Sequence, residues 1–197
     1  MQMKTLRYIF LMIAILPFAG CDTNDDGFYN ETYVDIPNLV QIDVQPTYTA
    51  GDYLYVSASL SRYLNEPGED LPLDIYTTTN GAEAFDFSYV LEKKVGDEWQ
   101  PVEIANAMLD VAAGSVYEIT PTIFASATYD PEIEMYKSTV GIPLETTGQF
   151  RLYFASADDS PKKAELRSQS ERNDLSLNIS STVSQLDANG FYIFTVN

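Results

Sequence analysis

Apolar and polar residues alternate along most of the chain after about residue 37, which is the pattern of half-buried β-strands. The alternation is clearest in the segments 39–44, 53–60, 85–91, 147–154, 175–180 and 191–196. Clusters of Gly, Pro, Asn and Asp near residues 50–52, 66–70, 80–81 and 96–97 separate these runs and indicate turns. Eight or nine short strands, with a turn about every ten residues, predict an antiparallel β-sandwich.

Two segments of the expected sheet have a distinct local pattern. Residues 86–104, with Gly96 in the middle, read as a β-hairpin, and Trp99 is expected to pack on that hairpin. Residues 116–129 read as one long or bent strand that is interrupted near Pro121.

Helix signals are few. Residues 105–113 fit a short helix or a loop that ends at Gly114. Ser160 and Pro161 resemble a helix start, but Leu166 is the only sizeable apolar residue in 162–172. We therefore expect 162–172 to be an exposed insertion between strands.

The segments Val140–Leu144 and Gly148–Tyr153 together resemble the E and F strands of immunoglobulin-like domains. The chain lacks the Cys pair and the core Trp of antibody domains, so the resemblance concerns architecture alone. It implies an all-β fold class, an antiparallel immunoglobulin-like β-sandwich of about 8–9 strands, for a domain over residues 37–197.

The N-terminus has the features of a secretory signal. Lys4 and Arg7 precede an uncharged, mostly apolar run over residues 8–19, and small residues follow at Ala19 and Gly20. The run is shorter than the roughly 20 residues that a spanning helix needs. Residues 1–20 are therefore expected to be a signal peptide that is removed.

The residues before Cys21 resemble the lipobox of bacterial lipoproteins, with Phe18 at the place where that family usually has Leu. The resemblance implies that Cys21 receives a lipid and begins the mature protein, so the partner is a membrane reached through that lipid. Cys21 is the only Cys in the chain and cannot form an internal disulfide. The alternative is an ordinary signal peptide with a Cys close to the cleavage site.

The polar run after Cys21 carries Asp22, Asp25 and Asp26. This acidic cluster resembles the surface-export signal of Bacteroidota lipoproteins, which implies an outer-membrane, lipid-anchored protein that faces the cell surface. The plain alternative is a solvated linker. We expect residues 21–36 to be a lipidated Cys followed by a flexible tether.

The same run matches half of a calcium-binding loop, with Asp22, Asn24 and Asp26 at alternate positions. The twelfth position of such a loop needs a bidentate Glu, and here it is Tyr33. We therefore predict no metal site there, and the sequence indicates no cofactor.

Charge excludes one class of partner. The 197-residue chain has 11 Lys and Arg against 29 Asp and Glu, a net charge of −18. Removal of residues 1–20 takes away Lys4 and Arg7 and leaves 177 residues with a net charge of −20. Nucleic-acid binding, which depends on basic residues, is not expected.

The chain contains no His, and Cys21 is assigned to lipid. Nucleophile–His arrangements and Cys/His zinc sites are therefore excluded, and we predict no enzyme and no catalytic residues. A carboxylate-dependent hydrolase is the weaker alternative, because two acids suffice for glycoside hydrolysis. The candidate carboxylates are Asp130, Glu132, Glu134, Asp158 and Asp159, and none of them stands out as a pair.

Binding is the better-supported class. Tyr is abundant, with 14 in the whole chain, and it combines apolar area with a hydroxyl that suits sugar or protein contacts. The candidates in turn-rich regions are Tyr48, Tyr63, Tyr76, Tyr129 and Tyr136. The sequence thus favours a surface-anchored binding or interaction module for a glycan or protein ligand, accessory to glycan uptake or adhesion. The alternative is a structural subunit of an envelope assembly.

Overall fold

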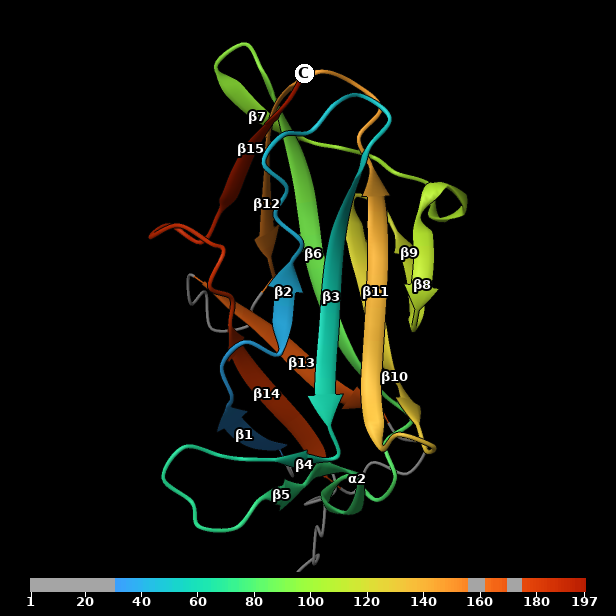
Figure 1. Ribbon diagram of the computed structural model, residues 1–197, viewed down its shortest axis with the longest axis vertical. Helices are drawn as coiled ribbons and strands as arrows, with labels where there is room; N and C mark the ends of the chain where they lie inside the picture. The colour runs from blue at the N-terminus through green and yellow to red at the C-terminus, as the bar shows by residue number, and fades with distance from the viewer. Residues whose placement is uncertain (1–30, 156–161, 170–174) are drawn as a thin grey trace, which may run out of the picture.

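The computed structural model describes residues 31–155, 162–169 and 175–197, and these residues are almost entirely β-strand (Figure 1). The strands are β1 (Glu31–Asp35), β2 (Val40–Ile42), β3 (Tyr53–Ser61), β4 (Tyr63–Leu64), β5 (Leu73–Asp74), β6 (Ala84–Val95), β7 (Glu98–Pro101), β8 (Asp110–Ala113), β9 (Ser115–Ile119), β10 (Thr122–Asp130), β11 (Met135–Pro143), β12 (Gly148–Phe154), β13 (Lys163–Gln169), β14 (Ser176–Thr182) and β15 (Tyr192–Val196). One short helix, α2 (Ile75–Thr78), and one 3-10 turn, η2 (Asn106–Met108), interrupt them. The all-β expectation is confirmed.

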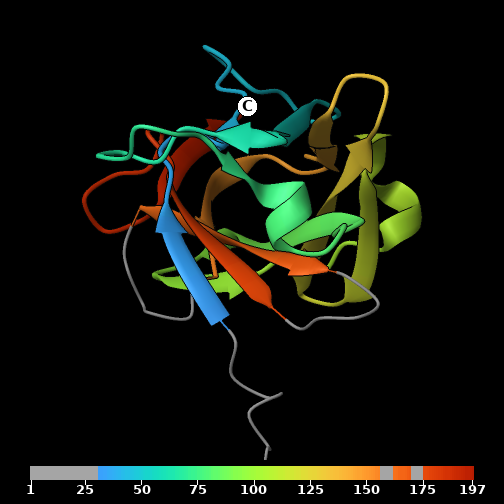
Figure 2. The same ribbon diagram turned by 90° about the horizontal axis from the view of Figure 1, so that it is seen from below.

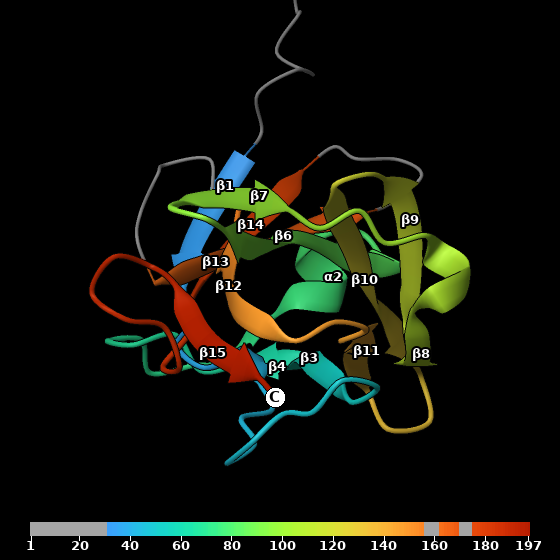
Figure 3. The ribbon, with the colours of Figure 1, turned by 90° about the horizontal axis from the view of Figure 1, so that it is seen from above.

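All the strands except β4 and β5 belong to one large sheet, which curls until its ends meet. Its main order is β1-β14-β13-β6-β10-β11-β3-β2. β1 and β2 stand at opposite ends of that order, yet only residues 36–39 join them, so the two edges must lie together. The Leu39 amide donates to Ser181 Oγ (2.9 Å) across this seam. Figure 3 shows the strands arranged around a common centre.

β6 is the strand around which the sheet branches. On one edge it pairs first with β13, through residues 84–86, and then with β12, through residues 89–93. On the other edge it pairs with β10 and then β7. Between β13 and β12, residues 87–88 form the fork at which the two strands diverge, and the Ala155 amide donates to the Ser88 carbonyl there (3.0 Å).

Alternate residues of each long strand point into the sheet's interior and form the core. Fully buried side chains from different strands include Leu54, Leu60, Phe85, Tyr89, Leu91, Tyr136, Ile142, Leu152 and Leu166. Each buried aliphatic side chain contributes roughly 1.5–3 kcal/mol relative to exposure. α2 lies across one end of this core, seen from below in Figure 2.

β1 begins inside the range expected for a flexible tether, so that boundary is corrected. Residues 31–35 pair in parallel with residues 176–180 of β14, and the side chain of Val34 is buried. The pairing partner is about 145 positions away in the sequence, and a single inward Val leaves little hydrophobic signal.

The segment expected to be an exposed insertion is also corrected, because residues 163–169 are strand β13. β13 pairs with β14 and β6, and its residues Ala164, Leu166 and Ser168 are buried. The charged residues of the segment occupy the alternate, outward positions. Two of its three inward side chains, Ala164 and Ser168, are small, which gives this strand the composition of a solvated loop.

The segment 116–129 is not one bent strand, which is a third correction. β9 and β10 run antiparallel and pair from Ser115 with Ser126 to Ile119 with Thr122, so the chain reverses at residues 120–121. The expected hairpin around Gly96 is confirmed as β6 and β7. Residues 105–113, left open between helix and loop, contain η2 and β8.

Candidate functional site

A groove of about 460 Å³ opens where β12 and β13 diverge from β6. It is lined by Asp86, Phe87, Ser88, Phe124, Ala155, Glu165 and Arg167. The lining combines aromatic rings with a few polar groups, and its volume falls in the range typical of ligand sites.

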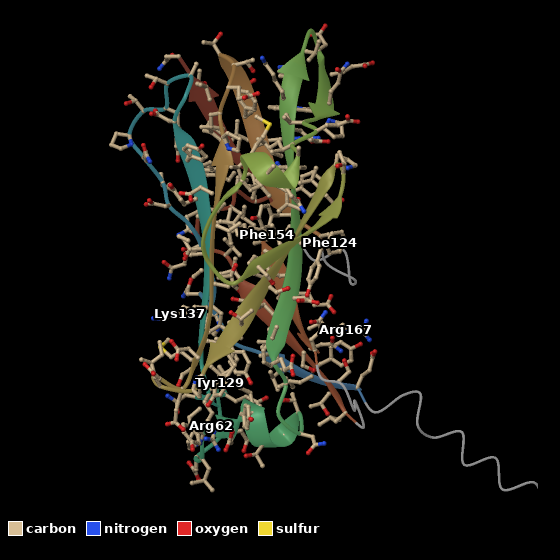
Figure 4. The ribbon with its side chains drawn as sticks, turned by 90° about the vertical axis from the view of Figure 1, so that its right-hand side faces the viewer. Arg62, Phe124, Tyr129, Lys137, Phe154 and Arg167 are labelled. Atoms are coloured by element: carbon tan, nitrogen blue, oxygen red, sulfur yellow. The ribbon has the colours of Figure 1, made fainter. Side chains whose placement is uncertain are left out.

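Strand register places Asp86, Ser88, Phe124 and Arg167 together on the outer face of the sheet, whereas the Phe87 side chain points into the core. Asp86 of β6 lies opposite Arg167 of β13 and Ser126 of β10, and Ser88 lies opposite Phe124. Opposed residues in a sheet project from the same face, with Cβ atoms about 5 Å apart. Phe124 and Arg167 accordingly lie on the same side of the molecule in Figure 4.

Asp86 is the half-buried acid of the groove. Its burial raises the pKa of the carboxyl, and the hydrogen bond that Ser126 Oγ donates to Asp86 Oδ1 opposes this rise. The second carboxylate oxygen, Oδ2, has no hydrogen bond from any residue that the structure describes, so it is available to a ligand.

Arg167 lies beside Asp86 but is turned away from it. Its Nη2 donates to Glu31 Oε1 of β1 (2.5 Å), and its Nε donates to Ser176 Oγ of β14 (3.3 Å). Tyr33 Oη donates to the other oxygen of Glu31 (2.5 Å). The guanidinium charge is thus compensated by β1, on the side away from β6.

Two exposed tyrosines flank the groove on the same outer face. Tyr117 of β9 is directly opposite Phe124 and is 45% exposed. Tyr33, 64% exposed, is in register with Asn178, which is in register with Arg167. Neither tyrosine is among the ligand-contact candidates that the sequence offers. The outward positions of the expected strand 116–129 were the signal that could have identified Tyr117.

Of the five tyrosines expected as ligand contacts, none lines the groove. Tyr48 and Tyr136 are buried, and their hydroxyls donate to the carbonyls of Asp43 (3.0 Å) and Ala82 (2.9 Å). Tyr76 and Tyr129 are half-buried and stack on each other, with ring centroids 4.7 Å apart. Tyr63 is exposed beside Arg62 at the lower end of the molecule, where Figure 4 also shows Tyr129.

The candidate carboxylates at the β10–β11 turn have structural contacts. Asp130 Oδ1 accepts a hydrogen bond from the Glu132 amide (3.0 Å), and Glu134 Oε1 lies 2.8 Å from Arg62 Nη1. Within the described ranges no three His, Cys, Asp or Glu side chains form a group that could hold a metal ion. Asp158 and Asp159 lie outside those ranges.

Trp99 is opposite Lys94 in the β6–β7 hairpin, and Lys94 Nζ lies 6.0 Å from its ring centroid, so Trp99 packs on the hairpin as expected. Its ring lies 4.6 Å from the Arg151 guanidinium, and Arg151 Nε is 2.5 Å from Glu92 Oε2. The Arg151 guanidinium also lies 4.2 Å from the centroid of the Phe191 ring. This stacked ion pair is a second feature of the outer face, farther along β6 than the groove.

The residues predicted from the N-terminal motifs, Cys21, Asp22, Asp25 and Asp26, lie outside the described residues. In the part of the chain that the structure covers, no helix is long and apolar enough to cross a membrane.

No protein-family model matches this chain, and a comparison with curated proteins finds no match.

Proposed function

We propose that this chain is a lipid-anchored bacterial lipoprotein of the outer membrane, exposed at the cell surface, whose sheet domain is a binding module. The anchor rests on the lipobox-like residues before Cys21, and the surface orientation rests on Asp22, Asp25 and Asp26. The observation that carries the binding function is the groove between β12 and β13.

The chemistry of the groove supports recognition of a ligand. Phe124 offers apolar ring surface, while Asp86 and Ser88 place hydrogen-bonding groups beside it. A mostly apolar cleft with a few convergent polar groups is the usual form of a binding site. The ligand classes we propose are a glycan or a protein, in an accessory role in glycan uptake or adhesion.

We further propose that the curled sheet is an immunoglobulin-like sandwich. β11 and β12 are the segments that resemble the E and F strands, which belong to different sheets in such domains. In this chain β11 pairs with β3 and β10, and β12 pairs with β6 and β15, so the two strands do not pair with each other although they belong to one curled sheet. The absence of direct pairing between β11 and β12 is the feature that this proposal uses.

The binding function is tested with the mature chain, purified in detergent and applied to a panel of polysaccharides and to outer-membrane extracts. We expect a retained ligand whose binding falls when Phe124 is changed to Ala, because the ring forms one wall of the groove. Tyr63→Ala, which removes an exposed ring at the other end, is the matched control and should bind normally.

Three results would argue against this function. Equal binding by both variants would place the ligand elsewhere. Silence over the whole panel, together with stable co-purification of a membrane complex that tolerates Phe124→Ala, would favour the structural subunit. Shortening of a polysaccharide during incubation would favour the carboxylate-dependent hydrolase.

A further inference from the structure

We propose that the groove binds a basic side chain, Lys or Arg, carried on an extended segment of a partner protein. This inference rests on the proposed binding function and chooses the ligand's chemistry at the same site.

The charges around the groove favour a cation. The charged groups of its lining that have described partners are the Asp86 carboxylate and the Arg167 guanidinium. The Arg167 guanidinium is already paired with Glu31 of β1. An anionic ligand would meet an excess of negative charge, whereas an ammonium or guanidinium would be attracted.

Asp86 is the group of the groove for which the described residues supply no countercharge. It is half-buried, and among the described residues only the Ser126 hydroxyl, a neutral donor, binds its carboxylate. Burial of an uncompensated carboxylate is unfavourable, and a cationic hydrogen-bond donor at Oδ2 would relieve this. Arg167 is opposite in register but is held away by Glu31 and Ser176.

The apolar part of the groove suits the stem of such a side chain. Lys and Arg carry three or four methylenes between the backbone and the charge, and these pack on apolar surface while the charge stays at a polar site. Phe124 is half-buried and exposes ring surface to the groove beside Asp86. A cation close to an aromatic face gains a further electrostatic attraction.

The flanking tyrosines indicate an extended peptide rather than a free amine. Tyr33 on β1 and Tyr117 on β9 stand at the two sides of a six-stranded stretch, β1-β14-β13-β6-β10-β9. Five strand spacings of about 4.8 Å separate them by roughly 24 Å. An extended peptide of about seven residues covers that distance, and tyrosines are enriched in protein interfaces.

The test uses the mature chain in detergent and a fluorescent, end-blocked peptide of seven residues. The peptide has one central lysine with threonines on both sides, and its matched partner has norleucine in place of the lysine. Norleucine keeps the methylenes and removes the charge. We expect at least about tenfold weaker binding of the norleucine peptide, and weaker lysine-peptide binding at high salt.

Two variants that each remove one carboxylate charge locate the binding site. Asp86→Asn keeps an oxygen that accepts from Ser126 but removes the carboxylate charge. We therefore expect it to lower the affinity for the lysine peptide about tenfold. Asp70→Asn makes the same chemical change in the exposed β4–β5 connection and should stay within about twofold of wild type. If Asp86→Asn does not fold, the comparison of the two peptides on the wild-type chain still decides the question.

Four results would overturn the inference. Equal binding of the two peptides would show that the positive charge of the lysine is not recognised. Equal effects of Asp86→Asn and Asp70→Asn would show that the peptide is attracted only at long range by the negative charge of the protein. If free lysine or spermidine binds as tightly as the peptide, the ligand is a free amine and not a partner protein. If a polysaccharide binds in a Phe124-dependent way while both peptides fail, the proposed binding function stands and this inference falls.

Discussion

The Arg62 guanidinium forms a bidentate pair with the Asp74 carboxylate: Nε donates to Oδ1 at 3.0 Å and Nη2 donates to Oδ2 at 2.8 Å. Its remaining nitrogen, Nη1, donates to Glu134 Oε1 at 2.8 Å. Asp74 also caps α2 by accepting a hydrogen bond from the Thr77 amide. This one guanidinium therefore connects the end of β3, the start of α2 and the β10–β11 turn.

The Arg62–Asp74 pair makes part of the stability depend on pH. The Arg62 hydrogen bonds hold the pKa of Asp74 well below its usual range, with help from Thr77. Because the pKa is lower in the folded than in the unfolded state, where it is about 3.9, ionised Asp74 stabilises the fold above that pH. The contribution is lost as the pH falls below about 4 toward the folded-state pKa.

We expect Asp74→Asn to be less stable than wild type at pH 7 and the difference to shrink as the pH is lowered below about 4. Urea unfolding between pH 7 and pH 2 measures this. Asp70→Asn, an exposed change of the same kind, should show no such convergence. A difference that stays constant with pH would mean that the ion pair is not its cause.

Leu166 and Leu71 form a matched pair for testing whether β13 belongs to the core. Leu166 is 0% exposed on β13, and Leu71 is 81% exposed in the β4–β5 connection. Leu166→Ala should lower the free energy of unfolding by about 2–5 kcal/mol, because it leaves a cavity in a packed core. Leu71→Ala should change it by less than about 0.5 kcal/mol. Similar denaturant midpoints for the two variants would mean that residues 163–169 are not packed inside.

Gly114, between β8 and β9, is required by close backbone approach. Its φ is +77°, and a Cβ there would lie 2.2 Å from the Ser126 carbonyl oxygen. Gly68 has a similar φ of +95° but open space around it. Both Ala variants carry the conformational cost of about 1–2 kcal/mol, and Gly114→Ala should lose at least about 2 kcal/mol more through the clash. Thermal unfolding of the two variants checks the difference.

Cys21→Ala tests the anchor. Without the thiol no lipid can be attached, so we expect loss of fatty-acid labelling and release of the protein from membranes. Ser57→Ala, a mild change within β3, serves as the control and should remain labelled. Retention and labelling of the Cys21→Ala protein would show that the anchor assignment is wrong.

Surface export is tested separately from anchoring. Replacement of Asp22, Asp25 and Asp26 by Asn should leave the protein labelled with lipid but make it inaccessible to protease added to whole cells. Replacement of Glu66, Glu69 and Asp70 by the corresponding amides removes the same number of charges from the folded domain and should leave it accessible. If both variants are equally accessible to the protease, the acidic run does not direct surface export.

Period-two alternation predicted most of the sheet because strands such as β3 and β14 place apolar residues inward and polar residues outward. It failed at β13, where the inward residues Ala164 and Ser168 are small and the outward ones are charged. It also failed at β1, whose assignment depends on pairing with β14. Local sequence carries little information about a partner so distant in the chain.

The groove was hidden from the sequence for the same reason. Its walls come from β6, β10 and β13, and the sequence pattern of β13 predicts an exposed insertion rather than a strand. Asp86 and Phe124 become neighbours only through strand register, which no motif encodes. The tyrosines failed as markers because Tyr is used in this chain for the core, as at Tyr136, as well as for the surface.

Because the folded domain begins at β1, the position of β1 limits how far the domain can lie from the membrane. Nine residues separate Cys21 from Glu31, and a fully extended chain advances at most about 3.6 Å per residue. The greatest distance between Cys21 and Glu31 is therefore roughly 35 Å. Glu31 itself holds Arg167 at the rim of the groove. With Cys21 in the bilayer, as proposed, the groove samples only a shallow layer above the lipid, and its partner must be a neighbour in the same membrane or a molecule that approaches that closely.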